Sequence, residues 1–189
     1  MKTLKTKSLA RNVAFTAASL LALLSLSACA TAPRTAGGKS DLRHSSADAL
    51  NQARQNDPSL QNVIARSAGY AIFPSIGKGA VGIGGAYGKG DLYENNVVAG
   101  YCDMTQASIG FAFGGQEYTE ILVFENPAAV ERFKNGSFRF DAQATAVALK
   151  SGVGANAKFA NGVAVFTMDE AGLMYEASIG GQKFSYQAR

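Results

Sequence analysis

The sequence predicts an α+β fold in a single domain, a curved antiparallel sheet or barrel-like sandwich of about eight strands with two N-terminal helices and one inserted helix. Apolar residues recur at helical spacing only before Gly69 and again after Asn126. In the remaining segments they recur with the period of two that is typical of strands. Because the predicted strands follow one another and do not alternate with helices, antiparallel pairing is favoured.

Two helices are predicted between Asp41 and Gly69. The first has a thin apolar stripe, which predicts a position on the surface of the domain; the stripe consists of Leu42, Ala49, Leu50 and Ala53. Asp57 is placed to cap the second helix, with Pro58 at its first position. The third helix is predicted to begin after an Asn126 cap.

The predicted strands are separated by turns rich in glycine, asparagine and proline. They cover residues 70–73, 80–87, 97–104, 107–114, 118–124, 138–149, 153–159, 163–168, 173–179 and 183–186. The stretch from Gly77 to Gly90 contains seven of the 21 glycines. Because Val81, Ile83 and Tyr87 keep the period of two within it, we expect one strand to run through residues 80–87.

Three predicted strands, residues 80–88, 108–114 and 142–149, have one face made of small residues. Glycine inside a strand usually marks a close approach of another group to the backbone, and protein interiors are close-packed. Two interpretations remain open: a neighbouring element packs unusually near, or the face lines a slot for an acyl chain or other apolar ligand. The glycines that would line such a slot are Gly82, Gly84, Gly110 and Gly114.

Residues 1–28 have the layout of a bacterial lipoprotein signal peptide, with a basic start and an apolar segment too short for a membrane span of about 20 residues. Leu26-Ser27-Ala28-Cys29 resembles a lipobox, so Cys29 is the predicted lipidation site. An ordinary signal peptide with an incidental cysteine, or a membrane anchor, is the alternative. Residues 29–40 are predicted as the lipidated cysteine and a flexible tether, and residues 41–189 as the domain.

By resemblance to bacterial lipoproteins, Cys29 would carry a diacylglycerol and an N-acyl chain, which together anchor a protein stably. The resemblance also implies a location at the periplasmic face of the outer membrane, because Ala30 follows the cysteine. With Cys29 acylated, Cys102 has no disulfide partner and is predicted to be a small buried residue.

Charge and motifs exclude several classes of function. Residues 1–28 contain four of the 18 Lys and Arg residues, so 14 remain in the rest of the chain. They equal the 14 Asp and Glu residues in number, and the domain therefore has no net charge that would attract nucleic acid. The string Gly77-Lys78-Gly79-Ala80-Val81-Gly82 matches a dinucleotide-binding motif, but the glycines after it cannot open the helix that the motif requires.

No enzymatic activity, metal or cofactor is predicted. His44 is the only histidine and lies in a polar segment, so neither a catalytic pair nor a zinc site can be assembled around it. Two pairs of carboxylates lie close together, Glu117 with Glu120 and Asp169 with Glu170. Glu117 lies beside one predicted turn and the second pair within another, where solvation alone explains charged residues.

A series of motifs resembles the SYLF domain family, whose members include yeast actin-patch and mammalian phosphoinositide-binding proteins. The likeness covers about residues 41–186 and is more specific in the centre than in the last third. The motifs are Ala71-Ile72-Phe73-Pro74-Ser75, Gly77-Lys78-Gly79, residues 84–90, Ile109-Gly110-Phe111, Gly114-Gly115-Gln116 and Leu122-Val123-Phe124. The resemblance implies lipid binding without catalysis.

Two functions follow as hypotheses. In the first, a lipid-anchored envelope protein contacts phospholipid headgroups or an acyl chain through its domain, with Lys78, Lys89 and Arg66 as candidate contacts. Lysine supplies a point charge for phosphate, and glycine-rich loops beside it expose backbone N–H groups to an anion. In the second, a structural or interaction lipoprotein binds an envelope protein and no lipid through its domain.

Overall fold

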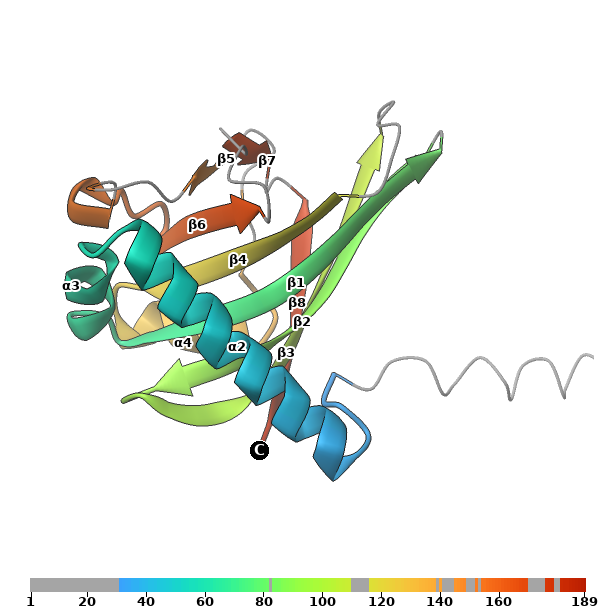
Figure 1. Ribbon diagram of the computed structural model, residues 1–189, viewed down its shortest axis with the longest axis horizontal. Coiled ribbons are helices and arrows are strands. Elements are labelled where there is room, and N and C mark those ends of the chain that lie inside the picture. The colour runs from blue at the N-terminus through green and yellow to red at the C-terminus, as the bar shows by residue number, and fades with distance from the viewer. Residues whose placement is uncertain are drawn as a thin grey trace, which may run out of the picture. The chain divides into compact units, whose positions relative to one another are not determined.

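Eight strands form one sheet, in the order β7-β5-β6-β4-β1-β2-β3-β8 (Figure 1). The structure, a computed structural model, describes residues 31–81, 83–109, 116–138, 140, 145–148, 152, 154–169, 176–178 and 181–189. The strands are β1 (Gly69–Val81), β2 (Ile83–Glu94), β3 (Val97–Ile109), β4 (Gln116–Phe124), β5 (Thr145–Ala148), β6 (Val163–Asp169), β7 (Glu176–Ser178) and β8 (Gln182–Ala188). Among the described residues, only β5 and β6 pair in parallel.

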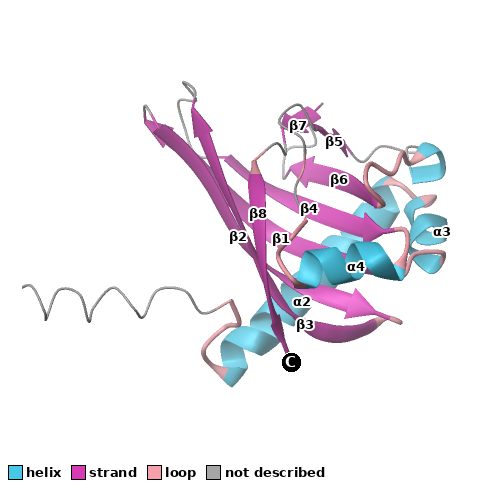
Figure 2. Ribbon diagram, turned by 180° about the vertical axis from the view of Figure 1, so that it is seen from behind, coloured by secondary structure: helices cyan, strands magenta, loops and turns pink. Residues whose placement is uncertain are grey.

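Helices cover both faces of the sheet. The helices are α2 (Ala36–Asn56), α3 (Leu60–Ala65) and α4 (Pro127–Lys134), with a 3₁₀ turn, η2, at Gly154–Asn156. Figure 1 shows α2 crossing one face, and Figure 2, seen from behind, shows α4 on the other. The α+β prediction with two N-terminal helices and one inserted helix is therefore confirmed.

Each face of the sheet has its own hydrophobic core. The alternation along β1 divides them, because Tyr70 and Ile72 pack under α2 and α3 whereas Ala71 and Phe73 face α4. Neighbouring strands supply both cores in the same alternating way. A sheet with two buried faces needs apolar residues on both sides, which explains the unbroken apolar sequence 70–73.

A bulge at Pro74 bends β1. The register of β1 shifts between Ile72 and Ser75 against β2, and between Phe73 and Ile76 against β4. As a result Phe73 and Ile76, three residues apart, both belong to the core beside α4. Proline has no N–H for the ladder and is tolerated at such a bulge, which increases the local bend and twist of the strand.

The edge strand β8 folds over the side of the sheet that faces α4. The ring of Phe184 lies 5.8 Å from that of Phe73 on β1 and 5.3 Å from that of Phe133 on α4. The side chain of Gln182 reaches Glu120 on β4, although three strands separate β8 from β4 in the sheet. The sheet is thus strongly curled, while its edge strands β7 and β8 remain at opposite ends of the strand order.

The prediction of one strand through residues 80–87 is wrong. β1 ends at Val81, β2 begins at Ile83, and these two residues pair with each other, so the glycine-rich stretch is a hairpin. Residues that pair across an antiparallel ladder lie on the same face, so the period of two continues through a tight reversal. Glycine lowers the cost of such a reversal, and the pattern alone cannot reveal it.

Other boundaries also differ from the predictions. Residues 153–159 do not form the predicted strand, since their described part contains the 3₁₀ turn η2. The predicted strands 97–104 and 107–114 join in the single strand β3, and of 138–149 only β5 is described as a strand. α2 begins at Ala36 with Thr35 as its cap, so the last part of the predicted tether is helical.

Asp57 joins the α2–α3 corner to a distant loop. Its carboxylate accepts hydrogen bonds from the N–H and hydroxyl of Ser59 and from the N–H groups of Gly152 and Gly154. α3 itself begins after Ser59, so Asp57 stabilises the corner and does not cap the helix as predicted. Burial alone would raise the pKa of Asp57, but these hydrogen bonds outweigh it and lower that pKa.

We expect Asp57→Ala to lower the free energy of unfolding by about 2–4 kcal/mol at pH 7, because several charge-assisted hydrogen bonds are lost. Since the folded-state pKa lies below the unfolded value of about 3.9, the stabilisation is complete above that pH and disappears as the pH falls through the folded pKa. Urea unfolding of residues 31–189 at pH 7 and pH 3 measures both effects. Asp48→Ala on the exposed side of α2 is the control, and equal losses in the two variants would contradict the prediction.

Candidate functional site

The three cations predicted to contact lipid lie in three separate places. Lys78 pairs with the core residue Ala86, so it belongs to the face of the sheet that packs on α4. Lys89 pairs with Ser75 and lies on the opposite face, and both lysines are on strands and not on the predicted loops. Arg66 precedes β1 and lies about 30 Å along that strand from Lys78. Its Nε donates to the carbonyl oxygen of Asn62 at 3.1 Å.

Lys89 holds the start of the domain. Its Nζ donates to the carbonyl oxygen of Thr31 at 2.9 Å and lies 5.9 Å from the ring centroid of Tyr87. The N–H of Ala32 donates to Oε1 of Gln187 on β8 at 3.2 Å. The first described residues are therefore fixed to β2 and β8, and the ammonium group of Lys89 has a structural role as well as any role in binding.

The small-residue face of β2 is a packing surface at Gly88 and Gly90. A Cβ atom at Gly90 would lie 2.4 Å from the Ile72 carbonyl oxygen and 2.9 Å from a ring carbon of Phe73. At Gly88 it would lie 2.7 Å from Cγ1 of Ile76. The bulged strand β1 thus fills this space. At these two positions the small face packs closely against a neighbouring element and does not line a ligand slot.

The four glycines predicted to line a ligand slot are not tested by this observation. Gly82, Gly110 and Gly114 lie outside the described residues. Gly84 lies on β2, where it pairs with Ala80 and Ser108. A slot at these positions remains a prediction.

We expect Gly90→Ala to destabilise the domain by about 1–3 kcal/mol, because the added methyl group forces the β1 backbone and the Phe73 ring to move. Gly77→Ala is the matched control on the paired strand, since no atom lies within 4 Å of the position of its Cβ. Urea unfolding of the two variants beside the wild type measures the difference. Equal stabilities of the two variants would show that the small face is not tightly packed.

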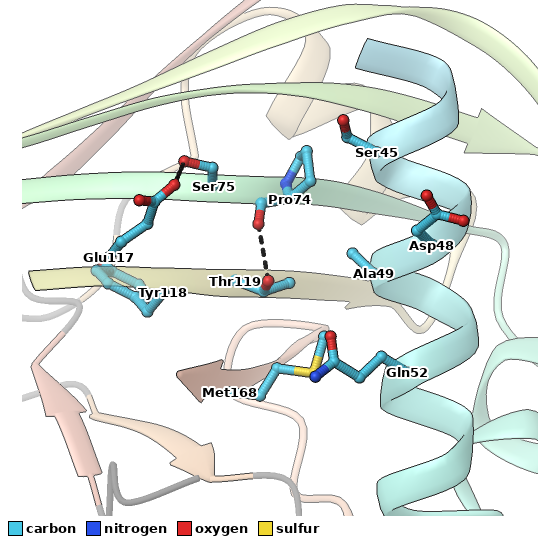
Figure 3. Close-up of a pocket in the computed structure, with 10 residues that line it drawn as sticks. All are labelled: Ser45, Asp48, Ala49, Gln52, Pro74, Ser75, Glu117, Tyr118, Thr119 and Met168. Atoms are coloured by element: carbon cyan, nitrogen blue, oxygen red, sulfur yellow. Dashed lines mark hydrogen bonds between the residues drawn. The ribbon is translucent and has the colours of Figure 1, made fainter. Parts of the chain in front are cut away.

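A groove of about 300 Å³ lies between α2 and the bulged part of the sheet (Figure 3). α2 contributes one wall and strands β1, β4 and β6 the other. The lining residues are Ser45, Asp48, Ala49, Gln52, Pro74, Ser75, Glu117, Tyr118, Thr119 and Met168. The bulge shapes the groove, because Thr119 Oγ1 donates to the carbonyl oxygen of Pro74 at 2.8 Å and Ser75 Oγ donates to Glu117.

The groove is acidic. Its two charged lining residues, Asp48 and Glu117, are exposed carboxylates that come from elements distant in the sequence. Together with hydroxyl and amide groups they accept hydrogen bonds from hydroxyl or amine groups and repel phosphate. Sequence reasoning missed the groove, because only the bulge brings Ser75 and Glu117 together opposite α2.

A buried polar pair lies on the other face of the sheet. Gln182 Nε2 donates to Glu120 Oε2 at 2.9 Å, and both residues are fully buried. Glu120 Oε1 and Gln182 Oε1 have no hydrogen-bond partner among the described residues. Burial raises the pKa of Glu120 to about 7, against a smaller opposing effect of Gln182, and a proton on the carboxyl supplies a donor that the pair lacks.

Sequence reasoning did not predict the burial of Glu120. Glu117 and Glu120 lie on opposite faces of β4, Glu117 in the groove and Glu120 in the core. The carboxylate of Glu120 also affects Tyr118. Burial is the main cause that raises the pKa of Tyr118, and the nearby Glu120 charge is the second. Glu120 has no exposed surface in this structure, so the ionisation of its carboxyl affects the stability of the domain.

We expect Glu120→Gln to stabilise the domain at pH 8 but not at pH 5. The folded-state pKa of Glu120 lies above its unfolded value, so the wild type loses stability as the pH rises from about 4.3 to 7, and the loss is about 3 kcal/mol. A glutamine cannot ionise and avoids this loss. Thermal unfolding from pH 5 to 8 measures it, with Glu117→Gln as the exposed control; parallel curves for wild type and Glu120→Gln would contradict the assignment.

The other residues considered in the sequence analysis are the single histidine and the two cysteines. His44 is exposed on α2, and the described residues contain no group of three or more side chains placed to hold a metal ion. Cys102 is buried, as predicted, and has no disulfide partner among the described residues; burial raises the pKa of its thiol. Three predicted features lie outside the described residues: Cys29, Glu170 and the signal segment.

The curled open sheet with helices on both faces defines a small α+β domain whose interior is filled by aromatic side chains. More particularly, residues 105–188 match the family model Ysc84, described as "Las17-binding protein actin regulator". Residues 105–188 are therefore similar to the Ysc84 family, also called SYLF. The match covers the segment from β3 to β8 and leaves out the glycine-rich hairpin, where the motif likeness was more specific.

One curated relative is the "Beta cell expansion factor A" of Aeromonas veronii. It is 27% identical over 137 residues, which are 72% of this chain and 52% of that protein. The chain thus spans about half the length of this relative.

Proposed function

We propose that this protein is a lipoprotein anchored through Cys29 at the periplasmic face of the outer membrane, and that its SYLF domain contacts membrane lipid without catalysing a reaction. The observation that supports it is the attachment of residues 31 and 32 to the sheet, directly after the predicted lipidation site. The similarity of residues 105–188 to the Ysc84 family supports the non-catalytic part of the proposal.

The attachment matters because it limits the distance between Cys29 and the sheet. Thr31 is two residues from Cys29, a separation of at most about 7 Å in an extended chain. Thr31 is bonded to Lys89, and Ala32 is only 6% exposed. An acylated Cys29 would therefore hold β2 and β8 at the bilayer surface, whereas a long flexible tether would leave the domain free to move away.

The lipid contact is better explained by a surface than by a headgroup pocket. Lys78, Lys89 and Arg66 do not converge, and the groove beside α2 carries carboxylates that repel phosphate. No helix among the described residues combines the length and apolar character that crossing a membrane requires. Anchoring by acyl chains, with the domain lying on the surface, fits these observations.

The anchor is tested by mass spectrometry and fractionation of the full chain. We expect the mature protein to begin at Cys29 with diacylglycerol and N-acyl groups and to fractionate with the outer membrane. Cys29→Ala should remain unmodified and leave the outer-membrane fraction. An unmodified Cys29 in the wild type would rule out the anchor.

Lipid contact by the domain itself is tested by flotation of unlipidated residues 30–189 with anionic and outer-membrane-like vesicles. Binding is the expected result, and its absence from both vesicle types would remove this part of the proposal. Unchanged binding after Lys78→Ala combined with Lys89→Ala would exclude the two lysines as the contact. Since the lysines lie on opposite faces, the single variants separate the faces.

A protein partner in the cell envelope is the second candidate. Two observations favour it: the family description names the binding of a protein, and the groove carries two exposed carboxylates, which favour a polar partner over an acyl chain. Crosslinking that recovers a partner, combined with no lipid in the mass spectrum of the purified domain, would support this candidate over lipid contact.

A further inference from the structure

Part of the sheet face that carries α2 is left uncovered. Near the start of the domain this face is occupied, since Lys39 lies over the ring of Tyr101 and Thr31 is bonded to Lys89. Beyond Lys89, towards the free ends of β1, β2 and β3, six exposed residues on four strands form what we call the outer patch. They are Gly77, Gly85, Tyr87, Thr105, Ala107 and Lys183.

The strand register shows that the outer patch is continuous. Gly77 pairs with Tyr87, Tyr87 with Thr105, and Thr105 with Lys183, which makes one row across β1, β2, β3 and β8. Gly85 and Ala107 pair in the next row. Figure 1 shows the ends of β1, β2 and β3 extending past α2, which leaves this part of the face open.

The composition of the outer patch suits a membrane interface. Tyr87 is 49% exposed, and no atom lies within 4 Å of the Cβ position of its partner Gly77, so the ring stands on a flat surface. Tyrosine is enriched at the headgroup level of bilayers, because its ring is apolar and its hydroxyl is polar. Lys183 in the same row and Lys89 in the next contribute positive charge near anionic headgroups, whereas Glu117, which pairs with Gly77 in the same row, and Asp103 contribute negative charge on this face.

The outer patch also lies beside the point where the chain enters the domain. Lys89, which binds Thr31, and Tyr87 are separated by two residues on β2, or about 7 Å. Thr31 is in turn two residues from Cys29. An anchor at Cys29 therefore brings this face, and not the face that packs on α4, closest to the bilayer.

We propose that the outer patch is the surface that rests on the membrane, with the Tyr87 ring inserted among the lipid headgroups. The inference rests on the proposed function, because the anchored Cys29 determines which face meets the bilayer. The occupant is the membrane into which the acyl chains insert, and the patch requires no pocket.

The absence of tryptophan from the sequence allows a direct test. Tyr87→Trp places a single tryptophan in the outer patch of the full lipidated chain, reconstituted into vesicles that contain brominated phospholipid. Val97→Trp is the matched control: Val97 is 61% exposed but lies at the other end of β2 and β3, about 23 Å along the strands. Ala107→Trp is a second patch variant in case the first does not fold.

We expect the emission at position 87 to shift to the blue and to be quenched by brominated lipid, with neither change at position 97. Equal quenching at both positions, or quenching at 97 alone, would overturn the outer patch while the anchor stands. If the protein floats with the vesicles but the tryptophan at position 87 is not quenched, the outer patch does not contact the membrane and this inference is overturned. That result is expected if a protein partner occupies this face. Failure of the lipidated chain to float would overturn the anchor and this inference together.

Discussion

The bulge at Pro74 is the constraint on which the rest of the structure depends. By inserting one extra residue into β1, it turns both Phe73 and Ile76 towards α4, where they fill the space above the glycines of β2. On the opposite face the same irregularity presents Ser75 to Glu117 and opens the groove beneath α2. A regular strand would send Ile76 to the other face and leave a cavity in the core.

The two faces of the curled sheet differ in how much of their surface is exposed. The face beside α4 is sealed by β8, whose Phe184 packs on Phe73 and Phe133, and it contains the buried Glu120. The face beside α2 carries the groove, the attachment of Thr31 and the open rows of β1, β2 and β3. This asymmetry supports a function on the α2 face, since a buried core leaves no surface for a lipid or a protein partner to contact.

Sequence patterns predicted elements well where one local rule applied. The Asn126 cap with Pro127 predicted the start of α4, and the cap is present: Ala129 N–H donates to Asn126 Oδ1 at 3.0 Å. The patterns failed where two arrangements give the same periodicity, as in the hairpin between Val81 and Ile83. They also gave no sign that Glu120 is buried, because its burial depends on β8, which is distant in the sequence and folds over it.

By itself the sequence determined the α+β class, the places of the three helices in the chain, and the family motifs, since each depends on neighbours along the chain or on short spacings. Only the tertiary structure decided that Lys78 and Lys89 lie on opposite faces, that Gly90 is covered by Phe73, and that Thr31 is held by Lys89. The physical reason is that a single bulge changes which side chains share a face. Its position depends on packing between strands, which no local pattern records.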